Sequence, residues 1–448
     1  MDTPICDFVR RYAESDAMRL HMPGHKGAGP LGVEHLDITE ISGADSLYEA
    51  SGIIQKSEQN AGMLFGAETF YSCEGSSLCI RAMLYLCALQ AKKTGRSPRI
   101  LAGRNAHKTF LSAVALLDLE VEWLYPAQDS SYLSCPITAE DLSRRFKTSD
   151  ELPVAVYLTS PDYLGNMVDL HAIGEVCHQY GVLLVVDNAH GAYLRFLPES
   201  RHPMDLGADL CCDSAHKTLP VITGGAYLHI SLHAPRWMGK QAKAAMTLFG
   251  STSPSYLILQ SLDWVNAYLS GDYRQHLADF VAQTDTLRQR LTAYGYTLTG
   301  DEPLKLTIST KPCGYRGEAL AALLQAQGIV CEFADPDYLV LMLTPKIGGD
   351  GLKQLEKILL SIPMSTPIAD QPPILHCPRK VMPVRQAVLS DSETIPAEDS
   401  LGRVLAAATV SCPPAVPVVV CGEEIDEQAL DCFRYYGIAD CTVVREDA

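Results

Sequence analysis

The chain has 448 residues, enough for two or three domains with a large buried core, and 47% of its residues are hydrophobic. This composition excludes a disordered protein. The formal charge of −17 argues against nucleic acids and anionic membrane surfaces as partners, because binding to phosphates requires basic patches.

The 15 cysteines include no Cys-x-x-Cys pair, and no secretory signal precedes them. We therefore expect free thiols in a reducing, cytoplasmic environment. No apolar stretch reaches the ~18–20 residues that a membrane helix needs. The histidines lack zinc-site spacing with the cysteines, so we expect no metal site.

The first 60 residues are rich in Gly, His and Asp and predict an irregular arm with a short helix near residues 6–14. Within this arm, residues 27–32 formally match the dinucleotide-binding pattern G-x-G-x-x-G. No strand precedes the match and Pro30 interrupts it, so we reject a dinucleotide site.

A long helix is predicted over residues 76–93. Its apolar residues lie on nearly all faces, which indicates a buried helix. It opens with Gly75, Ser76 and Ser77, whose hydroxyls and free backbone N–H groups could bind a phosphate. The alternative for these three residues is an ordinary helix N-cap.

Short apolar runs predict the buried strands of an open, mostly parallel sheet, with a helix over residues 170–180 between two of them. The expected strands cover residues 99–102, 154–159, 182–186, 210–212 and 225–230. Ligands bind at the carboxyl ends of such strands. His107 follows the first of these strands, and Asp187 and Asp213 directly follow two others.

The rest of the chain predicts helices over residues 255–295 and then two smaller α/β segments joined by a proline-rich linker at 364–382. The expected domains are an arm (1–60), a large domain (61–290), a small α/β domain (291–368) and a C-terminal α+β domain (369–448).

Two segments carry the strongest chemical signal. Asp187 ends a strand that is expected to be buried, where a carboxylate needs a cationic partner. Lys217 follows about thirty residues later, in a small polar loop. This pair suits pyridoxal 5'-phosphate (PLP), in which a lysine forms a Schiff base and an aspartate keeps the pyridine nitrogen protonated. The alternative for Asp187 is a helix cap or a structural salt bridge.

Other polar residues complete this hypothesis. Ser214 and His216, beside the lysine, could add donors to the phosphate group. His107 could stack on the cofactor ring and contact a substrate carboxylate. His190 lies three residues beyond Asp187, and, like His107, it could equally be a structural loop histidine.

Together these motifs resemble the ornithine/lysine/arginine decarboxylase family, in the short form that lacks an N-terminal receiver-like domain. The resemblance covers nearly the whole chain and rests on residues 21–27, 40–47, 104–108, 187–191, 214–220, 251–256 and 382–444. Asn188 and Tyr193 depart from the family, which has Glu and His at these positions.

The resemblance implies an α/β, aspartate-aminotransferase-like (type I) PLP fold with a mostly parallel central sheet, and decarboxylation of arginine, lysine or ornithine to the amine and CO2 in polyamine biosynthesis. It implies Lys217, His107, Asp187 and His216 as catalytic residues. The residues expected to bind PLP are Gly75, Ser76, Ser77, His107, Asp187, His190, Ser214, His216, Lys217, Thr252 and Ser253.

In the family, the segment at 251–256 helps to bind phosphate across a dimer interface, so a homodimer or a higher homo-oligomer with shared active sites is expected. Asp45, Glu423 and Glu424 are candidates for binding the distal cation of the substrate. Two alternatives remain at this point. One is another type I PLP reaction, such as transamination or elimination, and the other is a non-catalytic regulatory or scaffold protein.

Overall fold

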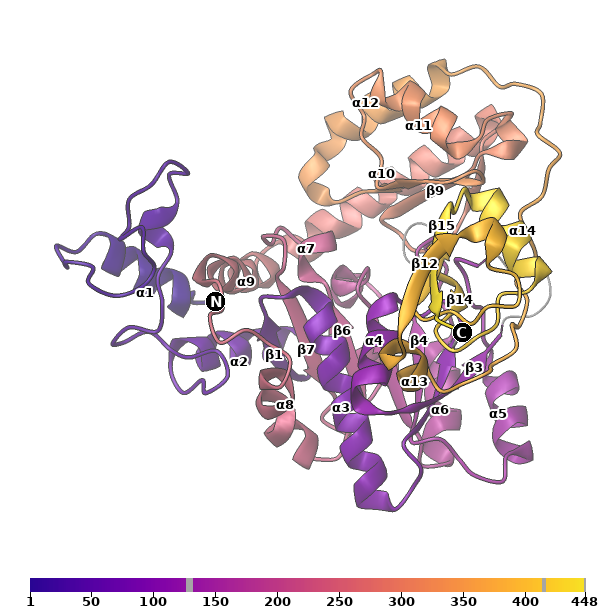
Figure 1. Ribbon diagram of the computed structural model, residues 1–448. Coiled ribbons are helices and arrows are strands. Elements are labelled where there is room, and N and C mark those ends of the chain that lie inside the picture. Colours follow the sequence, from indigo (N-terminus) through magenta and orange to yellow (C-terminus); the bar gives the residue numbers. More distant parts are fainter. Residues whose placement is uncertain (126–131, 413–415, 447–448) are drawn as a thin grey trace. The chain divides into compact units, whose positions relative to one another are not determined.

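The computed structural model describes residues 1–125, 132–412 and 416–446. These residues form two compact units, one of residues 1–90 with 183–278 and one of residues 91–182 with 279–448. Figure 1 labels their helices and strands. No helix in the described part of the chain is long and apolar enough to cross a membrane.

The first unit contains four strands in the order β1-β7-β6-β5. β5 and β6 are parallel, whereas β7 runs antiparallel to both of its neighbours. The elements of this unit are α1 (Pro4–Ala13), α2 (Ile53–Phe65), β1 (Glu68–Ser72), β5 (Leu183–Asp187), β6 (Leu210–Asp213), α7 (Ala215–Thr218), β7 (Ala226–Ile230), α8 (Trp237–Thr247) and α9 (Tyr256–Ser270). Two helices begin in this unit and end in the other, namely α3 (Gly75–Thr94) and α10 (Tyr273–Tyr294).

The second unit begins with the parallel strands β4-β2-β3. Its elements up to residue 182 are β2 (Arg99–Gly103), α4 (Lys108–Leu117), β3 (Glu120–Leu124), α5 (Ala139–Thr148), β4 (Ala155–Thr159) and α6 (Leu170–Gln179). The strands predicted from short apolar runs are thus confirmed as β2, β4, β5, β6 and β7, and the helix predicted at residues 76–93 is confirmed as α3.

The same unit continues with an antiparallel sheet in the order β10-β11-β9-β8 and then with two strand pairs, β12-β15 and β13-β14. The elements of this part are β8 (Thr297–Thr299), β9 (Lys305–Ser309), α11 (Gly317–Gln325), β10 (Phe333–Ala334), β11 (Tyr338–Met342), α12 (Gly348–Ser361), α13 (Val384–Leu389), β12 (Ser392–Pro396), β13 (Thr409–Cys412), β14 (Val416–Val420), α14 (Glu427–Tyr436) and β15 (Asp440–Val444).

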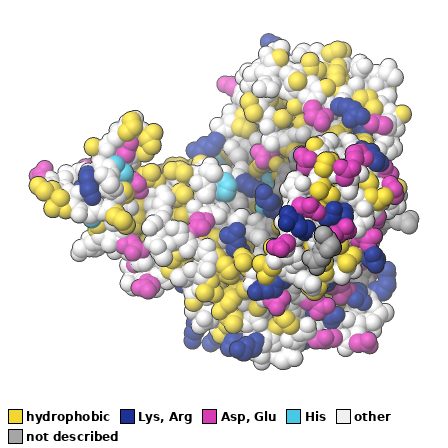
Figure 2. All heavy atoms as spheres, viewed as in Figure 1, with side chains coloured by type: hydrophobic (Ala, Val, Ile, Leu, Met, Phe, Trp, Pro, Cys, Tyr) yellow, Lys and Arg dark blue, Asp and Glu magenta, His cyan; other side chains and the backbone are white. Residues whose placement is uncertain are grey.

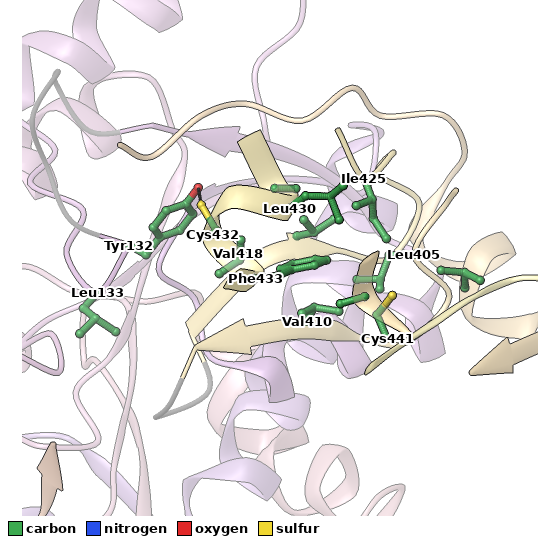
Figure 3. Packing of buried hydrophobic residues seen from close by; sticks show 14 of the residues in the cluster. Tyr132, Leu133, Leu405, Val410, Val418, Ile425, Leu430, Cys432, Phe433 and Cys441 are labelled. Carbon is green, nitrogen blue, oxygen red and sulfur yellow. Dashed lines mark hydrogen bonds between the residues drawn. The ribbon is translucent and has the colours of Figure 1, made fainter. Parts of the chain in front are cut away.

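A hydrophobic cluster holds the C-terminal elements together (Figure 3). Phe433 and Leu430 of α14 pack into it with Val418 of β14. At its edge, the Cys432 thiol donates to the hydroxyl oxygen of Tyr132 over 3.1 Å. The amphipathic pattern of α14 therefore serves to close this core.

The helix α2 begins inside the segment that was expected to be irregular, so this expectation is wrong from residue 53 onwards. Its first turn is capped by the Asp45 carboxylate, which accepts the backbone N–H groups of Gly52 and Ile54 over 2.7 and 3.1 Å. Because the cap lies seven residues before Gly52, a search for local capping patterns does not find it.

Apolar side chains are exposed on the arm that follows α1, and Figure 2 shows hydrophobic side chains over this arm, at the left of the view. Met18 and Leu20 expose 81% and 83% of their surface, and Leu31 exposes 79%. We call this set the apolar face of the arm, and it comprises Met18, Leu20, Met22, Leu31 and Val33. Large contiguous patches of exposed apolar side chains are typical of interaction surfaces.

One carboxylate in the turn between β10 and β11 should make stability depend on pH. Asp335 is 2% exposed, and its Oδ1 accepts the N–H groups of Asp337 and Tyr338, whereas its Oδ2 has no partner among the described residues. Burial raises the pKa of Asp335 to about 7. An unfolded aspartate has a pKa of about 3.9, so the folded state binds the extra proton between these values. The contribution of Asp335 to the stability of the folded state is therefore complete below about pH 4, and it is lost as the pH rises through about 7.

We therefore expect the free energy of unfolding of Asp335→Asn to fall less than that of wild type as the pH rises. Since one pKa unit corresponds to about 1.4 kcal/mol, wild type should lose on the order of 2–4 kcal/mol more than the variant between about pH 4 and about pH 8. Urea unfolding at the two pH values measures this difference. The exposed Asp350 provides a control, because Asp350→Asn should leave the pH dependence unchanged. An unchanged slope in Asp335→Asn would contradict the assignment.

Candidate active site

Lys217 lies on the short helix α7, directly after strand β6. The turn is closed by a backbone hydrogen bond from Lys217 N to Ser214 O of 2.9 Å. The side-chain Nζ of Lys217 lies 2.9 Å from Nε2 of His190. Because a lysine amine in its charged form can only donate, this contact makes His190 Nε2 an acceptor. The two residues that the sequence placed in separate motifs are therefore brought together.

The start of α3 forms the second part of the site. Gly75 has φ +67, a conformation that favours glycine, and its N–H donates to Gly224 O over 2.7 Å. Ser76 Oγ accepts a hydrogen bond of 2.9 Å from Ser214 Oγ. The N-terminus of a helix attracts anions through its free N–H groups and its dipole. Ser76 and Ser214 thus place two hydroxyl groups where a phosphate would be held.

His216 is placed beside this helix end. A Cβ atom added to Gly75 would lie 4.0 Å from His216 Cε1, at ordinary van der Waals distance. His216 Nδ1 lies 2.9 Å from Gly225 O, and since a carbonyl only accepts, Nδ1 carries the hydrogen. Burial lowers the pKa of His216. The neutral ring therefore presents Nε2 as an acceptor.

Asp187 is the last residue of β5 and is 3% exposed. Its Oδ1 accepts the Ala189 N–H over 3.2 Å and the Cys212 thiol over 3.5 Å. A buried carboxylate is stabilised by a cationic group beside it. This environment suits a protonated pyridine nitrogen.

The remaining predicted residues lie in three places. Thr252 and Ser253 are exposed, in the loop between α8 and α9. Ser77 lies in the first turn of α3 and is half-buried. His107 belongs to the second unit, where its Nδ1 accepts the Thr109 N–H over 3.2 Å at the start of α4. Its contact with a cofactor ring stays a prediction.

The three carboxylates predicted to bind the distal cation of a substrate are engaged elsewhere. Asp45 caps α2. Glu423 is 3% exposed and accepts from Arg104 over 2.9 Å, and Glu424 pairs with Arg379. Asp45 and Glu423 thus already accept hydrogen bonds within the chain, and a role for them in binding a substrate cation stays a prediction.

Sequence reasoning did not find the cluster around Asp213. This carboxylate is fully buried and accepts from Asn188 Nδ2 over 2.7 Å, from His202 Nε2 over 3.0 Å and from His229 Nε2 over 3.1 Å. Burial alone would raise the pKa of Asp213, but the two imidazoles outweigh it and hold the pKa well below its usual range. No local pattern joins these residues, since His229 reaches Asp213 only through the pairing of β6 with β7.

The described residues fit PLP by their chemistry. A lysine amine, a helix N-terminus with two serine hydroxyls and a buried carboxylate all belong to the first unit. These three groups match an aldehyde, a phosphate and a pyridine nitrogen, in that order. Every residue predicted to bind PLP except His107 lies in this unit.

Comparison with known proteins gives consistent results. A sequence model of the family described as Orn/Lys/Arg decarboxylase, major domain, matches residues 3–299. An uncharacterised protein of Bacillus subtilis (strain 168), YaaO, is 30% identical, with 96% of this chain and 93% of that protein covered. An arginine decarboxylase of Halalkalibacterium halodurans is 29% identical over the same shares of the two chains.

Among solved structures, the lysine decarboxylase LdcF of Francisella novicida superposes with a TM-score of 0.80 at 16% sequence identity. The match covers 99% of this chain and 81% of that one. At this identity the likeness concerns the fold, and it extends to a NifS-like protein and to an alanine–glyoxylate aminotransferase from Nostoc sp.. The fold is therefore the aspartate-aminotransferase-like (type I) fold with a mostly parallel central sheet, as the sequence predicted.

Proposed function

The chain belongs to the Orn/Lys/Arg decarboxylase family and is a decarboxylase, and we propose that it acts on arginine, lysine or ornithine with PLP as its cofactor. The products would be CO2 and the corresponding amine. The observation that carries this proposal is the 2.9 Å contact of Lys217 Nζ with His190 Nε2, in the turn that also holds Ser214 against α3. An arginine decarboxylase among the relatives and a lysine decarboxylase among the structures support a basic substrate.

Each residue of the proposed site has its own role. When bound, PLP supplies a protonated ring that withdraws the electrons left behind by the departing carboxylate. Lys217 holds the cofactor, and its amine later returns a proton to the α-carbon of the substrate. His190 Nε2 accepts a proton from the Lys217 ammonium group, so that the amine becomes nucleophilic. Asp187 offers a buried negative charge to the ring nitrogen.

We assign the proton transfer at the α-carbon to Lys217 rather than to His216. His216 Nδ1 is committed to Gly225 O, and burial lowers the pKa of the ring. A neutral imidazole in this tautomer has no hydrogen on Nε2 to give. His216 then serves to shape the phosphate end of the site beside Gly75.

The amines released would each carry a second cationic group, as the building blocks of polyamines do, and we propose a place in polyamine biosynthesis. A cytoplasmic location is part of the same proposal. It is supported by the free thiols of the described cysteines, most of which are buried.

The test is to load the protein with PLP and incubate it separately with arginine, lysine and ornithine. Mass spectrometry identifies the amine, and a coupled assay measures CO2. We expect one of the three substrates to give both products. A keto acid would indicate an aminotransferase instead. A protein that stays colourless with PLP would indicate a non-catalytic role.

We further propose that the protein is a homodimer or a higher homo-oligomer, with the apolar face of the arm covered by a second copy. Thr252 and Ser253 are exposed, as residues that bind the phosphate of a partner subunit must be. Five exposed apolar side chains within sixteen residues of sequence would otherwise remain in contact with water.

Replacing Met18, Leu20 and Leu31 together with aspartate should therefore shift the protein to monomers. Light scattering after size-exclusion chromatography measures the mass, and decarboxylation should fall in parallel by about tenfold or more, because burying three charges in an interface is strongly unfavourable. Leu232→Asp is the matched control, since Leu232 is 67% exposed in another loop of the same unit. A triple variant that stays oligomeric would contradict the assignment of this face.

A further inference from the structure

Asp187 and Lys217 lie near the ends of two neighbouring parallel strands. In the register of β5 and β6, Asp187 pairs with Cys212, which immediately precedes Asp213. Successive side chains of a strand point to opposite faces of the sheet. Asp187 and Cys212 therefore share one face, and Asn188 and Asp213 lie on the other. The Cys212 thiol donates to Asp187 Oδ1 on the first face, over 3.5 Å.

The opposite face carries a short hydrogen bond between the two strand ends. Asn188 Nδ2 donates to Asp213 Oδ1 over 2.7 Å, and the backbone N–H of Asn188 donates to Cys212 O over 3.0 Å. Both side chains are fully buried. This hydrogen bond thus links Asn188, which follows Asp187, to Asp213, which precedes the turn that carries Lys217.

The orientation of the amide is fixed by its surroundings. Asn188 Oδ1 has no hydrogen-bond partner in the described part of the chain. It lies 1.9 Å from the position that a Cβ of Gly191 would occupy, so glycine is required there. Turning the amide would direct its oxygen at the Asp213 carboxylate. The Asn188 amide therefore donates to Asp213 although its own oxygen stays without a partner. The Asp213 carboxylate thus determines the orientation of this amide.

The other side of Asp213 is held by two imidazoles. His202 Nδ1 accepts the Met204 N–H over 3.3 Å, so its hydrogen sits on Nε2, which points at Asp213. His229 Nδ1 lies 2.9 Å from Thr69 Oγ1, and its Nε2 also faces Asp213. The carboxylate is therefore a buried anion surrounded by donors.

The position of the hydrogen on His202 argues against a metal site in this cluster. Ligand atoms of His202, Cys211 and Asp213 lie within 4.8 Å of one another, as in a metal site. However, an imidazole binds a cation through a nitrogen without hydrogen. The only such nitrogen of His202 is Nδ1, and it is already bonded to the backbone of Met204.

We propose that Asn188 and Asp213 are positioning residues for the cofactor, because their bond sets the spacing of the strand ends that carry Asp187 and Lys217. This inference rests on the proposed function. The pair needs one carboxylate and one amide. Two carboxylates at this distance would repel each other, and the strand ends would separate, moving Asp187 away from the ring nitrogen while Lys217 remains linked.

The test uses isosteric changes in the full-length protein. Asn188→Asp brings two carboxylates together, and we expect it to weaken PLP binding at least tenfold and to alter the visible absorption of bound PLP. The double variant Asn188→Asp with Asp213→Asn moves the carboxylate to the other strand. An asparagine at position 213 can accept from both imidazoles with its oxygen and donate to the new carboxylate with its nitrogen. PLP affinity should return to within about threefold of wild type.

Asp209 provides the matched control, because it ties the opposite ends of the same two strands. Its Oδ2 accepts the Leu184 N–H over 2.8 Å. Asp209→Ala should lower the melting temperature but leave the affinity for PLP and the absorption of bound PLP unchanged. If PLP affinity instead follows the melting temperature in all variants, or if the double variant fails to recover, the positioning role is overturned. A wild-type protein that does not bind PLP would contradict the proposed function itself.

Discussion

Replacing Lys217 with alanine should abolish decarboxylation, with a loss on the order of a thousandfold or more, because the chain then lacks the amine that links the cofactor and returns the proton. The geometry makes this loss specific. Lys217 is the residue that α7 presents to His190, with the two side-chain nitrogens 2.9 Å apart. The visible absorption of lysine-linked PLP should disappear as well, and spectrophotometry measures it independently of turnover.

The control is Lys240→Ala, which removes an exposed lysine from α8 in the same unit. It should leave both activity and absorption unchanged. A Lys217→Ala protein that keeps full turnover, with PLP still bound to a lysine, would show that another lysine carries the reaction. The assignment of the site would then fail, although the family membership would not.

The second large effect is expected at Asp187. Asp187→Asn keeps the size of the side chain and removes its charge, so the pKa of the cofactor nitrogen should fall and its electron-withdrawing power with it. We expect decarboxylation to fall on the order of a hundredfold to a thousandfold, since a lost charge contact of this kind is worth about 3–4 kcal/mol in a buried site. PLP should still bind through Lys217.

The measurement is the rate constant at saturating substrate together with the absorption spectrum of the bound cofactor. Asp169→Asn is a suitable control, because Asp169 caps α6 through the Ala172 N–H and plays no part in the proposed site. If Asp187→Asn retained the wild-type rate, the nitrogen of the cofactor would have to be held by another group.

Those parts of the fold that depend on local pattern could be predicted from the sequence. β4, β5 and β6 are buried over nearly all of their residues, and such strands appear as uninterrupted apolar runs. Both ends of α3 carry residue types that are typical of helix ends, such as the serines of its first turn. In contrast, β1 has a single exposed residue followed by mixed burial, and its pairing with β7 comes from tertiary packing.

The candidate site shows the same division. Lys217, Asp187 and the serines at the start of α3 could be predicted because each belongs to a short motif next to a strand end or helix end. The environment of Asp213 could not, because His202 and His229 come from a loop and from another strand. The contact of Glu423 with Arg104 could not be predicted for a related reason, since Arg104 lies more than three hundred residues earlier in the chain.

The arm is attached at both of its ends by buried carboxylates. Asp263 of α9 accepts the N–H groups of Ile5 and Cys6 at the start of α1, and Asp45 accepts those at the start of α2. The exposed stretch between α1 and Asp45 is thus a loop closed by non-covalent anchors. A protease that cuts this loop should yield two fragments that stay associated in native buffer and separate only in denaturant, so cleavage alone would not release α1.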